Sequence, residues 1–279
     1  MFEFFAALND PQIPFLRYAL LAGLMASIAF GVIGSYVVVR RITYIAGAIS
    51  HCVLGGIGAG LYAQSKGVVW LEPILGALIT ALLAAIVIGL VSIHAKERED
   101  TVIGALWAIG MAVGLLFIAA TPGYVDPMSY LFGNILLVSQ KDLWLIIGLD
   151  FLVVGVGWFF YNNFLAVCFD EEYARIRGLN TSAYYLALLC LTALTVVLLV
   201  RVVGIVMVVA LLTLPAAIAG HFVRGLWQMM VLASMLCMVF VSGGLAASYS
   251  LDLPTGPVII IFAGAVYLCV AVGQRLRSS

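Results

Sequence analysis

Charged residues are scarce in this chain of 279 residues: Asp, Glu, Lys and Arg make up 9% of it, whereas a soluble domain carries about a quarter. Hydrophobic residues make up 65%, and the mean hydropathy is +1.21. The apolar residues come in blocks of about 20, long enough for helices to cross a hydrocarbon core of about 30 Å. Outer-membrane strands would instead alternate in segments of about 10. The composition predicts an all-α polytopic protein embedded in the lipid bilayer.

Neither sign of charge dominates, since 13 basic and 13 acidic residues give a net charge of zero. No nucleic-acid partner is therefore expected.

The chain has no CxxC spacing, and most of its five cysteines lie in apolar blocks. We therefore expect neither a disulfide framework nor a structural zinc site. The cysteines are Cys52, Cys168, Cys190, Cys237 and Cys269. The first residues, MFEFFAALNDPQIP, lack a basic n-region and a cleavage site, so we expect no removable signal peptide.

Catalytic motifs are also missing. The sequence contains no Walker motif, no GxSxG, no HExxH and no intramembrane pair of carboxylates beside an obvious nucleophile. We therefore expect no catalytic residues and no enzymatic activity in this chain.

Nine apolar blocks qualify as transmembrane spans. They cover residues 16–39, 47–64, 69–93, 101–120, 143–161, 183–200, 202–222, 227–249 and 256–273. Only Arg201 separates two of them, so a merged count of eight is the alternative. A further apolar piece over 128–138 is too short to cross and is predicted to be re-entrant or interfacial.

Basic residues flanking short loops predict the orientation. With nine spans, five basic sites fall on one side of the membrane, which should be the cytoplasm. They are Arg40 and Arg41, Lys96 and Arg98, Arg175 and Arg177, Arg224, and Arg275 and Arg277. Lys141 and Arg201 are exceptions on the outer side. The N-terminus is therefore predicted outside and the C-terminus in the cytoplasm.

Four ionisable residues lie within or beside the apolar blocks: His51, Glu72, Asp150 and His221. Each is costly in hydrocarbon, by about 2.5–3.5 kcal/mol for Asp on insertion scales, so each marks a candidate site. Glu72 precedes Pro73 near a span end and is expected to reach the interface. His221 is expected beside the inner boundary, solvated or among lipid headgroups. Asp150 is either a site residue or a helix-pairing residue bonded to a neighbouring hydroxyl.

The stretch GAISHCVLGGIGAG, residues 47–60, places His51 among glycines and other small residues. Small residues let other helices approach closely. A neutral imidazole can bind zinc, iron or manganese, and Ser50 and Cys52 flank it with an oxygen and a sulfur. Two interpretations stay open: a ligand on an ion path, or a histidine bonded to a backbone carbonyl at a tight helix crossing.

The stretch CFDEEYARIRGLNTSAYY, residues 168–185, is amphipathic. Apolar residues recur there every three to four positions, at Phe169, Tyr173, Ile176 and Leu179. Acidic residues at 170–172 begin the turn and Gly178 ends it. Arg175 and Arg177 lie near the end that the helix dipole makes negative. The pattern predicts a short helix over 169–179 on the cytoplasmic surface.

Four stretches follow one another along the chain: RRITYIAGAISHCVLGGIG (40–58), YLFGNILLVSQKDL (130–143), FDEEYARIRGL (169–179) and VVGIVMVVALLTLPAAIAG (202–220). Together they resemble the permease subunits of bacterial ABC importers for zinc, manganese and iron(II). Each stretch alone is a weak signal, but all four occur in the family's order and spacing, and the resemblance covers almost the whole chain. It implies a type II ABC importer-like fold of eight or nine transmembrane helices, in a single permease domain over 1–279.

The resemblance also implies roles for individual residues. His51 matches the family's histidine on the metal route, and Cys52 and Asp150 are further candidate ligands. The helix over 169–179 matches the coupling helix that docks into a cleft of the ATPase subunit. Its coupling residues are Asp170, Glu171, Glu172, Tyr173, Ala174 and Gly178. Pro215, in the segment that ends Pro-Ala-Ala, is expected to kink its helix by removing one backbone hydrogen bond.

The implied assembly is a homodimer in the bacterial plasma membrane. An ATP-binding cassette subunit binds and hydrolyses ATP beneath each copy, and an extracytoplasmic metal-binding protein docks above. The permease holds no permanent cofactor and transports Zn²⁺ or Mn²⁺. Two alternatives stay open: an ABC permease for cobalamin or haem-type metal chelates, and a secondary carrier that works without ATP, which inverted repeats or several intramembrane charges would favour.

One position departs from the family's pattern. Many members carry Asp four residues before the histidine, as in GDALSH, whereas this chain has Gly47. A hard oxygen ligand is therefore absent at that position, and carboxylate suits manganese better than imidazole or thiol does. The substitution favours zinc over manganese as the transported ion.

Overall fold

The computed structural model describes residues 14–68, 70–94, 99–123, 126–133, 135 and 138–278, which are predominantly α-helical. Nine helices in these ranges are long and apolar enough to cross a membrane. They are α2 (Pro14–Val39), α3 (Thr43–Ser65), α4 (Pro73–His94), α5 (Glu99–Ala120), α7 (Gln140–Phe159), α10 (Thr181–Val203), α11 (Ile205–Phe222), α12 (Leu226–Leu251) and α13 (Thr255–Ser278). The predicted fold class is confirmed with nine spans. The boundaries shift by a few residues, and α3 begins at Thr43 rather than at Gly47.

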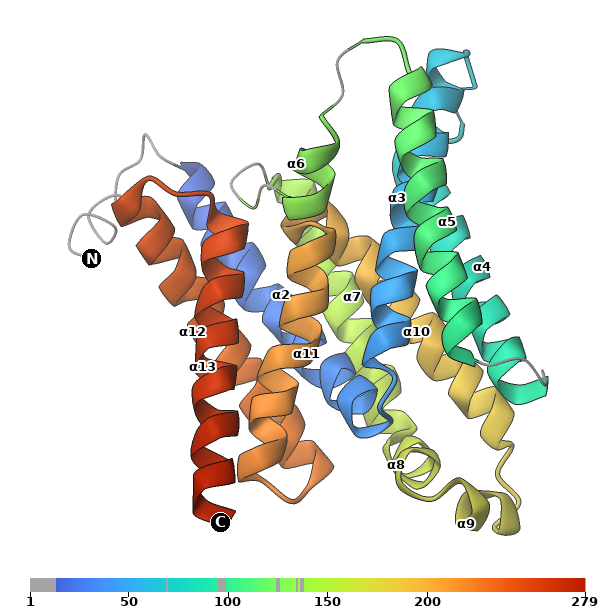
Figure 1. The fold of residues 1–279 in the computed structure, drawn as a ribbon, viewed down its shortest axis with the longest axis vertical. Coiled ribbons are helices and arrows are strands. Elements are labelled where there is room, and N and C mark those ends of the chain that lie inside the picture. The colour runs from blue at the N-terminus through green and yellow to red at the C-terminus, as the bar shows by residue number, and fades with distance from the viewer. Residues whose placement is uncertain are drawn as a thin grey trace.

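The spans pack as three neighbouring groups (Figure 1). α3 packs against α4 and α5, α2 packs against α7 and α12, and α11 packs against α12 and α13. α10 contacts α3 and α4 and also reaches α2 and α11, so it joins the groups. α2, α3 and α10 are the most buried spans, whereas α5 and α13 are the most exposed. The helix that carries His51 therefore lies inside the bundle.

Consecutive spans run in alternating directions, so the segments that connect them lie at two opposite ends of the bundle (Figure 1). One end holds the loop after α2, the two short helices that follow α7, and the C-terminal end of α13. Its described arginines are Arg40, Arg41, Arg175, Arg177, Arg224 and Arg275. We call it the arginine-rich end. Lys96 and Arg98, predicted for the same side, lie outside the described residues.

A sharp break at Gly204 separates α10 from α11. Gly204 has φ +80° and ψ 162°, a conformation that residues with a side chain avoid. Gly133, which follows the short helix α6, also has a positive φ, of +64°. A Cβ on Gly204 would lie 2.8 Å from Cα of Gly133, so both glycines allow the two backbones to meet. Arg201 lies in the last turn of α10, and the break after it keeps α10 and α11 distinct, so the merged count of eight is wrong.

The apolar piece predicted over 128–138 contains a shorter helix, α6 (Pro127–Phe132). The Asp126 side chain caps α6 by accepting a hydrogen bond from the backbone N–H of Met128 at 3.0 Å. Residues 134, 136 and 137 lie outside the described part of the chain. Six residues are too few to cross a membrane, and α6 lies at the end opposite the arginine-rich end (Figure 1).

The amphipathic helix predicted over 169–179 is present as α9 (Glu171–Ile176), which follows α8 (Tyr161–Phe169). Asp170 begins α9 by accepting a hydrogen bond from the N–H of Tyr173 at 2.9 Å. Gly178, with φ +81°, follows its end. Phe169 belongs to α8 rather than to the predicted helix. The side chains of Phe169, Tyr173 and Ile176 are exposed, so other residues of this chain do not cover them.

Candidate functional site

Trp107 on α5 covers the face of α3 that carries His51. Tyr44, Gly47 and His51 follow one another at spacings of three and four residues, so they share one face of α3. The indole stacks on the imidazole of His51, with ring centroids 4.5 Å apart and an interplanar angle of 21°. The ring centroid of Tyr44 lies 5.5 Å from that of Trp107. The indole of Trp107 therefore covers the face of α3 that Tyr44, Gly47 and His51 share.

The imidazole of His51 has an unused polar atom. Its Nδ1 is buried and has no hydrogen-bond partner among the described residues. Its sequence neighbours bond elsewhere: Ser50 Oγ donates to the carbonyl of Ala46 at 2.8 Å, and Cys52 Sγ donates to that of Leu106 at 3.3 Å. The thiol is thus engaged by α5. The described residues thus provide no backbone carbonyl to Nδ1 of His51. An unpaired buried nitrogen is costly, and the role of His51 as a metal ligand stays a prediction.

Position 47 has no room for a side chain in this arrangement. A Cβ on Gly47 would lie 2.8 Å from Cζ3 and 3.0 Å from Cη2 of Trp107. An aspartate four residues before His51, as in the family pattern that the sequence resembles, would therefore require the indole to move. The position of the Trp107 indole therefore requires glycine at position 47.

Asp150 lies on α7 and is 9% exposed. Its Oδ1 is buried without a hydrogen-bond partner among the described residues, and its carboxyl contacts the backbone of Ala29 on α2. The contact is with a backbone group and not with the neighbouring hydroxyl that the helix-pairing interpretation required. The described contacts of Asp150 are with α2, whereas those of the His51 ring are with α5. A shared role of the two residues stays a prediction.

Within the described ranges, no three His, Cys, Asp or Glu side chains converge in a way that could hold a metal ion. A closed cage of four ligands binds an ion tightly, as in structural zinc sites. An isolated imidazole in a span suits an ion that binds briefly and moves on. The described residues around His51 form no closed cage of this kind.

A cavity of about 410 Å³ opens beside Trp107, between α3 and α11, and we call it the α3–α11 cavity. Tyr44, Gly47 and Trp107 line one side, and Thr213 and Tyr267 line the other. His51 is not among the residues that line it, because the indole lies over the imidazole. Trp107, and not His51, therefore borders the cavity.

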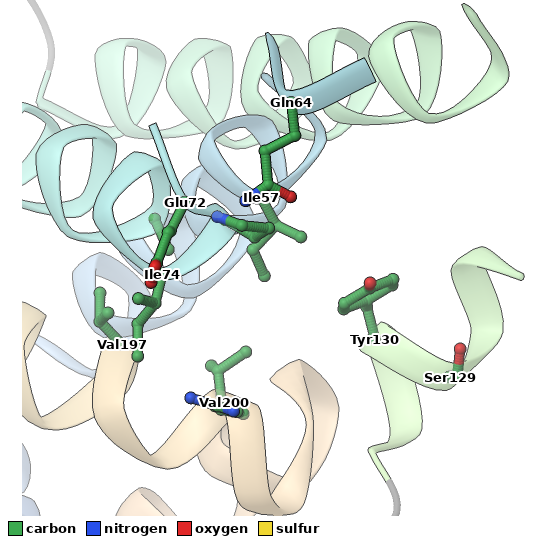
Figure 2. Close-up of a pocket in the computed structure, with 11 residues that line it drawn as sticks. Ile57, Gln64, Glu72, Ile74, Ser129, Tyr130, Val197 and Val200 are labelled. Atoms are coloured by element: carbon green, nitrogen blue, oxygen red, sulfur yellow. The ribbon is translucent and has the colours of Figure 1, made fainter. Parts of the chain in front are cut away.

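A second cavity, of about 490 Å³, lies between α3, α4, α6 and α10 at the end opposite the arginine-rich end, and we call it the α6 cavity. Figure 2 shows Tyr130 facing Gln64 and Glu72 across this space. The other labelled residues are Ser129 on α6 and the apolar Ile57, Ile74, Val197 and Val200. Glu72 is exposed there, and its predicted place at the membrane interface stays a prediction. Burial raises the pKa of Tyr130, so its hydroxyl stays neutral and offers an oxygen to the cavity.

Arg40, just after α2, joins α9 to the spans. Its Nη2 donates to Oε2 of Glu171 at 2.5 Å, and its guanidinium lies 5.4 Å from the ring centroid of Tyr185 on α10. Arg175 donates to the other oxygen of Glu171 at 3.2 Å. The hydrogen bond from Arg40 is the main reason that the pKa of Glu171 lies below its usual range. Glu171 thus connects the short helix α9 to α2, with Tyr185 of α10 beside the pair.

The other predicted site residues fall on α9 and α11. Glu172 and Tyr173 are exposed on α9, whereas Ala174 is buried. α11 continues through Pro215, and the kink expected there stays a prediction. His221 is exposed at the arginine-rich end, as predicted.

Sequence reasoning did not single out Trp107, and it used Arg40 only for orientation. A tryptophan in an apolar block has the same sequence signature whether it faces lipid, core or a site. The available signal was Gly47, since a glycine one turn before a histidine leaves room for a large ring. No comparable signal pairs Arg40 with Glu171, which is 131 positions away.

The sequence profile of the ABC 3 transport family matches residues 12–274. The chain is 42% identical over 255 residues to a probable metal transport system membrane protein of Chlamydia trachomatis serovar D, covering 91% of this chain and 87% of that protein. It is 32% identical over 256 residues to the manganese transport system membrane protein MntC of Listeria monocytogenes serovar 1/2a, covering 92% and 89%. The solved structure of PsaBC from Streptococcus pneumoniae in complex with Fab is similar with a TM-score of 0.84 at 29% identity, covering 96% of this chain and 94% of that one.

Proposed function

Because the chain belongs to the ABC 3 transport family, we propose that His51 binds the transported ion transiently on its way through the membrane. The chain is a multi-pass membrane permease of an ABC importer for divalent metal, and it is not the ATPase. The observation that supports this role of His51 is its buried Nδ1, which has no partner among the described residues and lies within a span. A neutral imidazole nitrogen is a common ligand of first-row transition metals.

Zinc is the cargo that we propose over manganese. Imidazole suits zinc, whereas carboxylate suits manganese. Trp107 occupies the space that a carboxylate at position 47 would need, so His51 lacks the hard oxygen neighbour expected from the family pattern. The Listeria relative is named for manganese, which makes manganese the alternative cargo.

The proposed assembly is a homodimer in the bacterial plasma membrane, with residues 1–279 of each copy forming one permease domain. The excess of arginine at one end supports a cytoplasmic arginine-rich end and an extracytoplasmic N-terminus. The exposed side chains of Phe169, Tyr173 and Ile176 support docking of α9 into an ATP-binding cassette subunit. Asp170, Glu171, Glu172, Tyr173, Ala174 and Gly178 then act as its coupling residues. An extracytoplasmic metal-binding protein delivers the ion above the α6 cavity.

Transport in this proposal is alternating access. ATP-driven closure of the cassette subunits displaces α9, and the Arg40–Glu171 pair passes the displacement to α2. Repacking of the spans then changes whether His51 communicates with the α6 cavity or with the α3–α11 cavity. ATP is bound and hydrolysed by the partner subunit.

Metal uptake by cells tests the role of His51. His51→Ala should lower accumulation of the transported metal, measured by elemental analysis under scarcity, by about tenfold or more, since loss of a metal ligand or of its supporting partner costs about that much. His221→Ala, which removes an exposed histidine, is the matched control and should transport normally. Co-purification of the cassette subunit shows that each variant assembles. Unchanged uptake in an assembled His51→Ala variant would contradict the proposal.

The same experiment addresses the two alternatives. A permease for cobalamin or haem-type chelates has no need of an imidazole ligand, so uptake of the chelate would survive His51→Ala. A secondary carrier would continue to accumulate metal when ATP hydrolysis by the cassette subunit is blocked. We expect metal uptake to require both His51 and ATP hydrolysis.

A further inference from the structure

The indole of Trp107 lies against His51 and also lines the α3–α11 cavity. On one side, the indole covers the imidazole at a centroid distance of 4.5 Å. On the other side, the same indole lines the α3–α11 cavity, which His51 does not line. The indole of Trp107 thus contacts the imidazole and also borders this cavity.

Trp107 is packed against α3 on one side and borders the α3–α11 cavity on another. Gly47 and His51 hold it against α3, where a Cβ on Gly47 would already lie 2.8 Å from Cζ3. The open side is the cavity of about 410 Å³, a volume in the range of small-molecule sites. Rotation of the indole away from His51 can proceed into the cavity, and it would expose the imidazole there.

The far side of the cavity suits an ion that arrives with part of its water shell. Thr213 of α11 and Tyr267 of α13 line the cavity together with the indole. The hydroxyl of Thr213 donates to the carbonyl of Val209 at 2.8 Å, so its oxygen is left as an acceptor. Oxygen atoms of this kind can replace or bridge water molecules of a hydrated divalent cation. An ion that leaves His51 can thus enter this cavity.

We propose that Trp107 is a movable aromatic barrier that closes the passage between His51 and the α3–α11 cavity. Its role in transport rests on the proposed function, whereas its role as a barrier concerns access to the imidazole alone. The stacked arrangement is the closed state. The ion passes when the indole leaves the imidazole and enters the cavity.

Carbethoxylation of His51 by diethyl pyrocarbonate tests the barrier directly. The permease is purified with its cassette subunit in lipid nanodiscs, and modification is followed by peptide mass spectrometry, with exposed His221 as the internal standard. Trp107→Ala should accelerate modification of His51 by about 2- to 10-fold, the range that corresponds to the loss of one aromatic pair. Trp107→Leu, which keeps apolar volume, is the second variant in case the alanine variant does not fold. Trp107→Phe keeps a ring and should have the smaller effect.

Trp158→Ala is the matched control, because Trp158 is 84% exposed on α7. It should leave the modification rate of His51 at the wild-type value. An unchanged rate in both Trp107→Ala and Trp107→Leu would overturn the barrier. That failure would leave the uptake test of His51→Ala standing, since the labelling measures access and not transport.

A second measurement tests the role in transport. Proteoliposomes that hold the permease and cassette complex are loaded with zinc without ATP, and the passive leak of zinc is followed. Trp107→Ala should raise this leak by about the same factor as the labelling, whereas Trp158→Ala should not. Faster labelling without a leak would overturn the role of Trp107 in the ion path.

Discussion

Trp107 lies where a side chain at Gly47 would have to lie, with its Cζ3 only 2.8 Å from the position of a Cβ on that glycine. The same indole stacks on His51 one turn further along α3. Residue 47, the indole and the imidazole therefore form one packed unit, and a change in one restricts the others. An aspartate at position 47 would clash with Trp107 as it is placed here. Without that aspartate, His51 has no carboxylate one turn away on the same face of α3.

Gly47→Asp alone should destabilise the protein. Forcing a larger side chain into a packed site costs about 1–3 kcal/mol, and a thermal unfolding assay on the purified complex measures the loss. Gly47→Asp combined with Trp107→Ala should recover most of the stability. In the double variant the carboxylate and the imidazole lie on one face, so uptake should shift towards manganese relative to zinc. Equal unfolding temperatures for the single and double variants would show that Trp107 does not restrict position 47.

Reversing the charges of Arg40 and Glu171 tests the connection between α9 and α2. Arg40→Glu should strongly reduce ATP-driven uptake, because Glu171 loses its hydrogen bond and faces a like charge. Stability should change little, since partly exposed ion pairs contribute about 0.2–1 kcal/mol. Adding Glu171→Arg should restore uptake in part. Normal uptake by the Arg40→Glu variant, or no recovery in the double variant, would argue against this connection.

The pH dependence of the same pair has a definite sign. The pKa of Glu171 lies below its ordinary value of 4.5, chiefly because of the hydrogen bond from Arg40. A carboxyl whose pKa is lowered by folding adds stability that is fully present above its unfolded pKa and is lost as the pH falls through its folded pKa. The stability difference between wild type and Glu171→Gln should thus be constant around neutral pH and shrink below about pH 4.5. A difference that disappears near neutral pH would contradict this assignment.

The break between α10 and α11 depends on Gly204. Gly204→Ala should destabilise the permease by about 1–3 kcal/mol, the usual cost of a strained backbone conformation, and its Cβ would press on Gly133. Gly148→Ala is the control, since a Cβ there meets nothing within 4 Å. That variant should be neutral or stabilised by about 0.5–1 kcal/mol, because alanine favours a helix. Similar unfolding temperatures for the two variants would count against a strained Gly204.

The spans could be predicted because a membrane requires blocks of about 20 apolar residues, and such blocks are visible without any contact information. The ends of α9 were also predictable. Asp170 and Gly178 act within one turn of the chain, through a side-chain cap and a positive φ. Local signals of this kind need only the neighbouring residues.

The contacts of the candidate site could not be predicted, since they join segments far apart in the sequence. Cys52 was expected to flank the imidazole, but its thiol bonds the carbonyl of Leu106 on α5. Asp150 was predicted to be either a site residue or a partner of a neighbouring hydroxyl, and its carboxyl contacts the backbone of Ala29. In both cases the partner depends on which helix packs alongside and on which of its faces makes the contact. When a helix is apolar on all sides, its sequence indicates neither.

X-ray absorption spectroscopy of bound zinc tests the central claim most directly, which is that the imidazole of His51 binds the transported ion. The permease and cassette complex is prepared in nanodiscs with His94→Gln and His221→Gln, so that His51 is the permease's only histidine, and zinc is added at one equivalent per permease. We predict imidazole scattering with a Zn–N distance of about 2.0–2.1 Å that disappears when His51→Ala is added. Identical spectra with and without His51 would contradict the account.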